Sequence, residues 1–572
     1  MPDIVLTTIN AKYIHAAFGL RYLLVNLGPL RSRARLLEFQ INQRPVDIVE
    51  ALLAEGPRII GLGVYIWNVT PATEVVALLK RVRPDIIIVL GGPEVSHETE
   101  QQEIVRLADH VITGEADLRF AELCKSLLER CSPTRSADHC TSTHCQEVLG
   151  PGREPQVEIE PSSKVLPIPK IITAPLPEFS QIALPYDLYD EADIGNRIVY
   201  VEASRGCPFT CEFCLSSLDV PVRQADLPAF LEAMRRLLDR GLRQFKFVDR
   251  TFNLHPATSR AILEFFLSRH RPGNFYHFEM IPDRLPAELR KVVRRFPAGA
   301  LQFEVGIQTF NPEVAERIRR RQNYDRLEDN LRFLRNETGV HIHADLVAGL
   351  PGESVESFAA GFDRLIALRP QEIQVGLLKR LRGTPITRHD TEWQMKYNPQ
   401  PPYEVLQTKT IDFATMQQVR RFARYWDLVS NSGNFIETTP MIWSGPIAPA
   451  SRGHDGNHSD AARPAAGDCA PDASPFDSFL KWSEWLHKRS GRTDGIALGR
   501  LMEWLFEFLT TERQLDPKQV AGVLARDYVR GGRRDVPHFL RELVQGSPPL
   551  RPMRSDSPPR RQARHLAARA SV

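Results

Sequence analysis

Short apolar runs alternate with amphipathic stretches along the first 120 residues of the chain. Five apolar runs have the length of buried strands, and they cover residues 3–8, 34–39, 58–66, 85–92 and 110–115. The stretches between the first four runs, such as TPATEVVALLKRVRP, repeat apolar side chains with the period of an amphipathic helix. Strands that alternate with helices predict βαβ units, in which helices cover both faces of a parallel sheet.

Ligands bind parallel sheets of this kind beyond the carboxyl ends of the strands. Candidate binding residues therefore follow the predicted strands: Thr7, Thr8, Asn10, Tyr65, Trp67, Asn68, Gly91, Gly92, Glu94, Gly114 and Glu115. Glycines allow a backbone to approach a ligand closely, although Gly91 and Gly92 could equally serve only to turn the chain. No GxGxxG motif follows the first strand, which disfavours a classical dinucleotide site.

A second alternation of apolar runs and amphipathic stretches begins after a linker. Its predicted strands cover residues 197–204, 244–249, 275–280, 300–307, 341–350 and 372–378. This pattern predicts six parallel strand–helix units, arranged either as a curved open barrel or as a doubly wound sheet. Barrel enzymes place their chemistry at the carboxyl ends of the strands, and the stretch RGCPFTCEFCLS directly follows the first of these strands.

Composition predicts the remaining regions of the chain. We expect a first domain over 1–130, a linker over 131–190, a barrel over 191–400, a helical domain over 401–548 and a disordered tail over 549–572. Residues 444–475 are rich in Ala, Pro, Ser and Gly and are expected to form a disordered insert. The linker contains possible metal ligands, but their spacing matches no common site and favours a solvated segment: Cys131, His139, Cys140, His144 and Cys145.

Overall composition is that of an ordinary globular protein, with 42% hydrophobic and 25% charged residues. The net charge of +3 gives no basic bias, so nucleic acid is not an expected partner. No apolar run reaches the roughly 18–20 residues that a membrane span needs, and MPDIVLTTIN does not resemble a secretory signal. Eight cysteines in 572 residues disfavour a disulfide scaffold and favour a reducing cytoplasm.

Three of the cysteines, Cys207, Cys211 and Cys214, are clustered in one short stretch. A structural zinc site requires four ligands, usually as two separated pairs, and no fourth Cys or His is close to these three in the sequence. A cubane iron–sulfur cluster is held by thiolates at short spacings, and three thiolates would leave one iron open to a substrate or cofactor. Accidental clustering in a core is disfavoured because Gly206 and Pro208 indicate a loop.

The spacing Cys207-x3-Cys211-x2-Cys214, with Phe213 before the third cysteine, resembles the signature of radical S-adenosylmethionine (SAM) enzymes. Later segments resemble the same family along the barrel: EVGIQTF at 304–310, HADLVAGLPGES at 343–354 and LKRLRGTP at 378–385. The resemblance implies a partial (β/α)6 barrel that binds a 4Fe–4S cluster and SAM.

The first domain resembles the Rossmann-like, flavodoxin-type cobalamin-binding domain that precedes the barrel in a large subgroup of these enzymes. GGPEVS at 91–96 and TGEAD at 113–117 resemble its loops. The D-x-H-x-x-G motif, whose His ligates cobalt, is missing, and His15 is better explained as a loop residue. The resemblance therefore implies cobalamin without a His ligand, and it equally permits a domain that has lost cobalamin.

The resemblance also implies roles for single residues. Cys207, Cys211 and Cys214 hold the cluster, whose open iron binds SAM. Contacts to SAM are expected from Phe213, Asp249, Glu304, Gly306 and Gln308, and contacts to cobalamin from Thr8, Asn10, Tyr65, Gly91, Gly92, Gly114 and Glu115. Two alternatives stay open: Asp249 caps a turn or pairs with Arg250, and Glu304 is an interior residue paired with an arginine.

Methylation of an unactivated carbon is the leading reaction that the resemblance implies, with a radical rearrangement or cyclisation as the alternative. A radical SAM enzyme whose first domain binds no corrinoid is a second alternative, and a non-enzymatic metal sensor is disfavoured. The family implies an electron donor such as flavodoxin or ferredoxin. Neither charge nor motif indicates the substrate.

Overall fold

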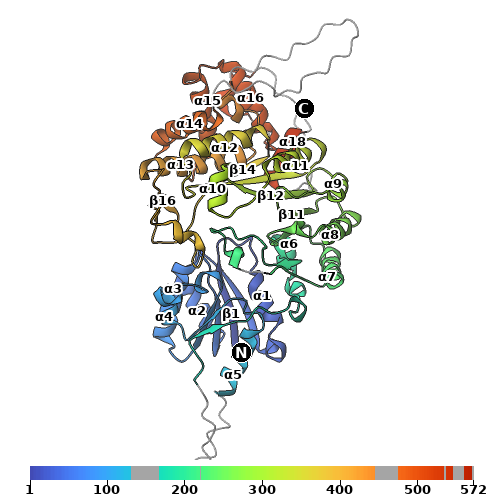
Figure 1. The fold of residues 1–572 in the computed structure, drawn as a ribbon, viewed down its shortest axis with the longest axis vertical. Coiled ribbons are helices and arrows are strands. Elements are labelled where there is room, and N and C mark those ends of the chain that lie inside the picture. Colours follow the sequence, from blue (N-terminus) through green and yellow to red (C-terminus); the bar gives the residue numbers. More distant parts are fainter. Residues whose placement is uncertain (131–166, 219–220, 445–473, 534–535, 545–558, 570–572) are drawn as a thin grey trace, which may run out of the picture. The chain divides into compact units, whose positions relative to one another are not determined.

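Two compact units make up the chain, Met1–Asp190 and Glu191–Val572. The computed structural model describes residues 1–130, 167–218, 221–444, 474–533, 536–544 and 559–569 (Figure 1). The possible metal ligands between Cys131 and Cys145, and nearly all of the insert expected near 444–475, lie outside these ranges. Within the ranges, every helix is too short or too polar to span a bilayer.

The first unit places a parallel sheet between two layers of helices. Its strands stand in the order β2-β1-β3-β4-β5-β6, with bounds Ile4–Asn10 (β1), Ala34–Gln40 (β2), Ile59–Gly63 (β3), Ile87–Gly91 (β4), His110–Thr113 (β5) and Ile171–Thr173 (β6). The first face packs against α2 (Pro45–Ala54), α3 (Val69–Val82) and α4 (Glu103–Leu107), and the second against α1 (Phe18–Val25) and α5 (Arg119–Arg130). This order confirms the predicted flavodoxin-type fold.

Strand β6 lies in the segment that the sequence assigns to the linker. It pairs in parallel with β5, with Val111 opposite Ile171. Of its three residues only Ile172 is buried, while its two neighbours are exposed. A strand of three residues is too short to show an alternation of apolar and polar side chains. Its position in the sheet is set by its pairing with β5 and not by its own side chains. The sheet therefore has one strand more than the sequence predicts.

The second unit contains six parallel strands that pair in the order in which they occur in the chain. From one edge to the other they are Glu372–Leu377 (β14), His341–Ala348 (β13), Leu301–Gln308 (β12), Phe275–Met280 (β11), Gln244–Phe247 (β10) and Val199–Val201 (β7). A doubly wound sheet would reverse its strand order at one point, so the consecutive pairing confirms the partial (β/α)6 barrel.

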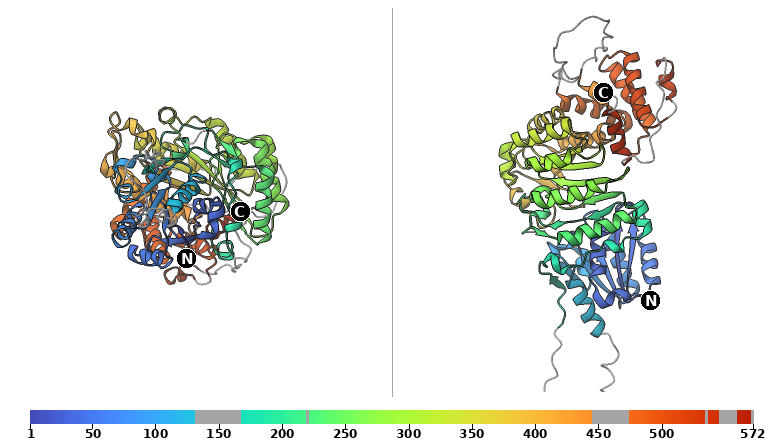
Figure 2. Two further views of the ribbon diagram at one scale, coloured as in Figure 1. Left: turned by 90° about the horizontal axis from the view of Figure 1, so that it is seen from below. Right: turned by 90° about the vertical axis from the view of Figure 1, so that its right-hand side faces the viewer.

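Helices connect the successive barrel strands and lie along the outer face of the sheet (Figure 2). They are α7 (Leu227–Asp239), α8 (Pro256–Ser268), α9 (Ala287–Val293), α10 (Pro312–Arg317), α11 (Tyr324–Glu337) and α12 (Val355–Ala367), and α6 (Glu191–Asn196) precedes β7. Several begin at a side chain that accepts a hydrogen bond from the first turn, as Asp226 does for α7 and Ser354 for α12.

The side chains that alternate toward the interior of the barrel are charged rather than apolar. Glu304 Oε2 lies 2.9 Å from His277 Nε2. Glu372 Oε1 lies 2.8 Å from His341 Nε2, and its Oε2 lies 3.5 Å from His343 Nδ1. Barrel interiors are usually filled by branched apolar side chains. Here acids and histidines are paired instead, because an unpaired buried charge strongly destabilises a fold.

We expect the stability of this unit to fall as the pH rises from about 6.5 to about 9. Burial lowers the pKa of His343, but its hydrogen bond to Asp345 and the charges of Asp345, Glu372 and Glu304 raise that pKa to about 9. The folded pKa thus exceeds the ordinary value of 6.5, so the stabilisation is complete below pH 6.5 and disappears as the pH rises through about 9. The full effect is of the order of 3 kcal/mol.

Thermal unfolding of the iron-free protein at a series of pH values measures this effect. The variant His343→Gln should flatten the profile over that pH range, because glutamine does not titrate. An unchanged profile in His343→Gln would assign the pH dependence to another group.

Helices dominate the chain after the barrel, as predicted. They are α13 (Phe413–Trp426), α14 (Pro475–Ser490), α15 (Leu498–Thr511), α16 (Pro517–Arg530) and α17 (His538–Arg541). Aromatic rings join them to the barrel, since Phe362 of α12 lies 5.2 Å from Phe422 and 4.8 Å from Trp426 between ring centroids. Helix α13 begins at Phe413, later than the start of the predicted helical domain at 401, because the chain before it forms the hairpin of β15 (Lys396–Tyr397) and β16 (Val405–Gln407).

The last helix, α18 (Arg560–Arg569), lies in the segment that the sequence predicts to be a disordered tail. Arg561 Nε lies 2.9 Å from Glu372 Oε2, and Gln562 donates to the side-chain oxygen of Gln302 at 2.8 Å. His565 is buried and lies 3.1 Å from the carbonyl oxygen of Asn431. This arginine-rich segment of low hydropathy is ordered because its polar side chains form ion pairs and hydrogen bonds with residues at the amino-terminal ends of the barrel strands.

Candidate functional site

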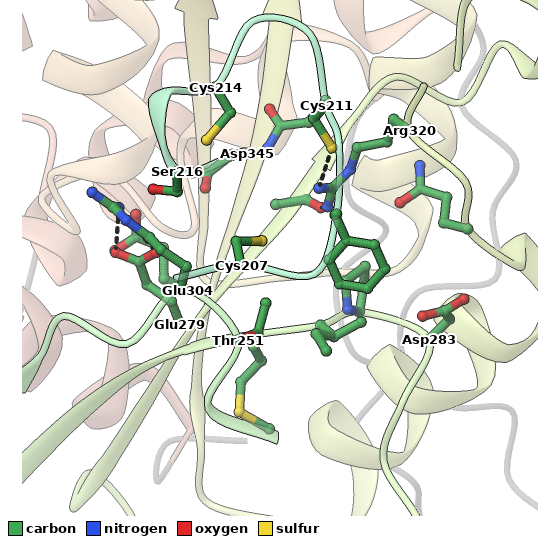
Figure 3. Close-up of a pocket in the computed structure, with 18 of the residues that line it drawn as sticks. Cys207, Cys211, Cys214, Ser216, Thr251, Glu279, Asp283, Glu304, Arg320 and Asp345 are labelled. Atoms are coloured by element: carbon green, nitrogen blue, oxygen red, sulfur yellow. Dashed lines mark hydrogen bonds and ion pairs between the residues drawn. The ribbon is translucent and has the colours of Figure 1, made fainter. Parts of the chain in front are cut away.

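One pocket in the second unit brings together residues from the carboxyl ends of the barrel strands. It has a volume of about 220 Å³, and its wall combines the loop after β7 with residues from β11, β12 and β13 (Figure 3). The strands contribute charged side chains, among them Glu279, Glu304 and Asp345, and Arg250 follows β10. This is the end of a barrel at which enzymes place their chemistry.

The three clustered cysteines all line this pocket. Their loop begins at β8 (Ser204–Arg205), which pairs with β9 (Arg223–Gln224) and so closes the base of the loop. Gly206 has a φ of +88°, a left-handed conformation that favours glycine where the chain turns into the loop. Figure 3 shows the thiols of Cys207, Cys211 and Cys214 arranged around one space.

This arrangement suits an iron–sulfur cluster better than a single metal ion. Among the residues that the structure describes, no three His, Cys, Asp or Glu side chains gather closely enough to hold one ion. The described pocket wall contains neither a fourth cysteine nor a histidine. A cubane cluster on three thiolates would have one iron without a protein thiolate. The donor set therefore fits the cluster that the motif predicts and disfavours zinc, which prefers four protein ligands in structural sites.

Arg320 is a pocket residue that the sequence does not single out. Its Nη1 donates to Sγ of Cys211 at 3.6 Å (Figure 3), and its Nη2 donates to the carbonyl oxygen of Gly306. A guanidinium in this place can balance thiolate charge and bind a ligand carboxylate. Arg320 is the middle one of three successive arginines, so only the fold determines which of them faces the thiols.

Four of the five residues predicted to contact SAM line the pocket: Phe213, Glu304, Gly306 and Gln308. The pairing of β12 with β13 shifts between Gly306 and Gln308, and Gln308 has a φ of +73°. A bulge of this kind redirects side chains at the end of a strand, and bulges are common beside active sites.

Glu304 presents an ionised carboxylate to the pocket. Burial raises its pKa, but the hydrogen bond from His277 and the charges of Lys246, His277 and His343 lower that pKa to about 2. The sequence also allowed Glu304 to be an interior residue paired with an arginine. In the structure its ion-pair partners are His277 and Lys246. Its carboxylate thus remains negative at physiological pH.

Asp249, the fifth residue predicted to contact SAM, is not part of the pocket wall. Its carboxylate accepts hydrogen bonds from Ser204 Oγ at 2.7 Å and from the backbone N–H of Ala203 at 3.0 Å. Burial raises the pKa of Asp249 to about 7, although these hydrogen bonds oppose the rise. The neighbouring Arg250 pairs with Glu279 instead. Asp249 therefore fixes the chain that enters the cysteine loop.

In the first unit, predicted binding residues gather where β1 and β3 end, at the point where the strand order reverses. Asn68 links the two ends, since its Nδ2 donates to Thr8 Oγ1 and to the carbonyl oxygen of Ile9, both at 3.1 Å. Asn10 donates to Glu38 at 2.6 Å. Thr8 and Asn10 are buried, so they shape this edge of the sheet rather than offer free polar groups.

Glycines and aromatic rings form the accessible part of the same edge. Gly92 has a φ of +109°, and a Cβ there would lie 2.4 Å from the carbonyl oxygen of Val64. Gly114, which precedes Glu115, has a φ of +82°. The ring of Tyr65 stacks on that of Trp67 at 4.5 Å, and Trp67 is 45% exposed. Glycines, which carry no side chain, leave room beside this exposed aromatic face for a large flat ligand such as a corrin ring.

We expect Gly92→Ala to reduce the corrinoid that the protein retains by roughly tenfold or more, because the close approach to Val64 and the left-handed backbone exclude a Cβ. The matched control is Gly28→Ala in the same unit. Gly28 also has a left-handed φ, of +55°, but it lies before the start of β2, and an added Cβ there would meet no other atom within 4 Å. Corrinoid absorbance after gel filtration of both variants, loaded with hydroxocobalamin, measures the difference. Equal retention in the two variants would contradict the assignment of this loop.

Comparison with known protein families agrees with the two-unit organisation. Residues 201–365 match the model of the radical SAM superfamily, and residues 4–124 match that of the B12 binding domain. Residues 391–445 match a family of unknown function. The two named models confirm the predicted family and its cofactor classes, which are a 4Fe–4S cluster with SAM for the second unit and cobalamin for the first.

Curated relatives are distant. An uncharacterised methyltransferase of Pyrococcus horikoshii is 24% identical over 323 residues, which are 55% of this chain and 65% of that relative. The cobalamin-dependent radical SAM methyltransferase TokK of Streptomyces tokunonensis is 24% identical over 374 residues, which are 60% of this chain and 51% of TokK. The chain thus spans between about half and two thirds of the length of these relatives.

A solved structure shares the fold. The radical SAM methyltransferase TsrM of Kitasatospora setae, with tryptophan and a SAM analogue bound, superposes with a TM-score of 0.52 at 16% identity. The superposition covers 70% of this chain and 79% of TsrM. At so low an identity the likeness concerns the fold alone.

Proposed function

We propose that this chain, a member of the radical SAM superfamily with a B12-binding domain that precedes the barrel in the sequence, is a methyltransferase acting on an unactivated carbon. The observation that carries the proposal is the convergence of Cys207, Cys211 and Cys214 on one pocket at the carboxyl ends of the barrel strands. Methyl transfer is supported by the combination of the two domains and by relatives that bear the name methyltransferase.

The three thiolates would hold the cluster, and the open side of the pocket would receive SAM. When bound, the cluster and SAM supply the reductive cleavage that starts radical chemistry, and cobalamin supplies the methyl carrier. Arg320 balances negative charge at Cys211, and the buried carboxylate of Asp249 keeps the entry to the cysteine loop in place.

Charges in the pocket match the charged groups of SAM. The ionised carboxylate of Glu304 is suited to the SAM ammonium, and the guanidinium of Arg320 to its carboxylate. Phe213 offers an apolar surface, and Gly306 and Gln308 line the pocket at the bulged end of β12. We assign these residues to binding and orienting SAM, which is the part of catalysis that the protein itself supplies.

In the first unit we assign cobalamin to the edge formed by Tyr65, Gly91, Gly92, Gly114 and Glu115. The exposed ring of Trp67, stacked on Tyr65 beside these glycines, supports this assignment. Thr8 and Asn10 contribute indirectly through the hydrogen bonds that order the ends of β1 and β2. The D-x-H-x-x-G motif is missing from this domain, so no residue is assigned to the cobalt.

The reaction needs an electron from outside the protein, and a reduced flavodoxin or ferredoxin is the expected class of donor. The three cysteines must stay reduced to bind iron, and this requires a reducing compartment such as the cytoplasm. No charged surface of this chain is assigned to the donor.

Anaerobic reconstitution with iron, sulfide and hydroxocobalamin tests the proposal. The reduced protein should contain a 4Fe–4S cluster and a corrinoid, and it should convert SAM both to 5′-deoxyadenosine and to S-adenosylhomocysteine, which is the product left when SAM gives up its methyl group. Formation of 5′-deoxyadenosine alone, with corrinoid bound, would favour a rearrangement or cyclisation. A cluster without retained corrinoid would indicate a first domain that no longer binds cobalamin, and zinc at the thiols would overturn the proposal.

A further inference from the structure

Glu212 lies inside the cysteine motif, between Cys211 and Cys214, yet it does not belong to the pocket wall. Its side chain is only 1% exposed. Since the flanking thiols face the pocket, the carboxylate is directed to the other side of the loop. A buried carboxylate beside three thiolates is unfavourable by desolvation and by repulsion between like charges. Its presence therefore requires a compensating set of partners.

The partners of Glu212 are two arginines and a histidine. Oε1 lies 3.0 Å from Arg319 Nε and forms a second, shorter ion pair with Arg388 Nη2. Oε2 lies 2.7 Å from His389 Nε2. The side chains of Arg319 and Arg388 are 57% and 45% exposed, whereas the carboxylate they hold is buried. The negative charge of the buried Glu212 carboxylate is thus balanced by two arginines whose side chains are largely at the surface.

Backbone hydrogen bonds join the same three segments. The N–H of Glu212 donates to the carbonyl oxygen of Ile318 at 3.1 Å, and the N–H of Ile386 donates to the carbonyl oxygen of Glu212 at 3.0 Å. One residue of the cysteine loop is therefore attached to the chain after α10 and to the turn Pro385–His389, which follows β14. Neither attachment passes through the thiols.

We propose that Glu212 is the positioning residue of the cluster site, which holds Cys211 and Cys214 in place before iron is bound. The inference rests on the proposed cluster at the three thiols. A loop that only needed to be packed could carry an apolar residue here without the desolvation cost. A carboxylate with three partners from two other segments instead fixes the orientation of the loop. Replacing residues that contact the ligands of a metal site, and not the metal itself, commonly lowers metal affinity by about 10–100-fold.

The test is Glu212→Gln, which keeps the shape of the side chain and removes its charge. After anaerobic reconstitution, the variant should lose its cluster to a chelator at least tenfold faster than the unaltered protein, as followed by the decay of visible absorbance. In the iron-free protein, hydrogen exchange should be at least tenfold faster in peptides covering 206–218 and 384–390. The matched control is Glu328→Gln on α11, because Glu328 also bridges two arginines, Arg332 and Arg364.

Equal chelator rates in Glu212→Gln and the unaltered protein would overturn the inference, as would equal acceleration in Glu328→Gln. If Glu212→Gln does not fold, Arg388→Gln provides the same test, because it removes one exposed partner and leaves the loop sequence intact. Unchanged cluster loss and hydrogen exchange in Arg388→Gln would then overturn it. Failure of the unaltered protein to assemble a 4Fe–4S cluster would contradict the proposed function instead, and the hydrogen exchange of the iron-free protein would still decide the role of Glu212.

Discussion

Alanine in place of Cys207, Cys211 or Cys214 is expected to abolish both the four-iron cluster and the cleavage of SAM. Each thiol lines the same pocket, and the described wall contains no other cysteine or histidine that could replace a lost ligand. A cubane held by two thiolates has two open irons and is readily lost to solvent. Iron content, visible absorbance and 5′-deoxyadenosine production after anaerobic reconstitution measure the effect.

Cys124→Ala is the matched control for these variants. Cys124 is a free cysteine that is fully buried in the first unit, where it packs against apolar side chains of α5 and the sheet. Its replacement should cost some stability but leave iron content and SAM cleavage unchanged. A full four-iron cluster in any one of the three alanine variants at 207, 211 or 214 would show that the ligand set is different from the one proposed.

Glu304→Gln is expected to weaken the binding of SAM to the reconstituted protein by roughly 30-fold, since a hydrogen bond between charged groups contributes about 2 kcal/mol. The carboxylate lines the pocket and stays ionised, because His277 and Lys246 hold its pKa well below the ordinary value. Glutamine keeps the shape of the side chain but cannot pair with an ammonium group. Equilibrium dialysis of labelled SAM measures the affinity.

Two further variants complete this experiment. Glu337→Gln changes an exposed carboxylate of α11 that pairs with Arg294 at the surface, and it should leave SAM affinity unaltered. Glu279→Gln changes a second strand-end acid of the pocket, which pairs with Arg250. If Glu304→Gln binds SAM normally and Glu279→Gln does not, the ammonium contact belongs to Glu279.

The alternation of apolar runs and amphipathic stretches was sufficient to predict both parallel sheets. Strands such as β1 and β12 are long enough to carry a readable pattern, and their helices repeat with a clear period. Strand β6 and helix α18 were not predicted, because neither depends on its own apolar pattern. The first is ordered by pairing with β5, and the second by ion pairs and hydrogen bonds to the barrel.

The cysteine loop shows a similar division between local and long-range information. Its three thiols could be recognised because a cluster-binding loop carries its ligands within a few residues of one another. The contact of Arg320 with Cys211 could not be predicted, because the two residues are far apart in the sequence. Asp249 is an acidic residue after a barrel strand, as a contact to SAM would require, but its carboxylate accepts hydrogen bonds from Ala203 and Ser204 instead.

Local patterns in the sequence were therefore sufficient to predict the order of the two domains, the parallel architecture of each and the three thiols of the candidate site. The charged side chains around the cysteine loop became visible only in the folded chain: Arg320 and Glu304 in the pocket, and Arg319, Arg388 and His389 around Glu212. The difference lies in the distance along the chain over which each kind of information acts. Periodicity and ligand spacing are properties of neighbouring residues, whereas a buried charge is stabilised by partners that only the folded chain brings within a few ångströms.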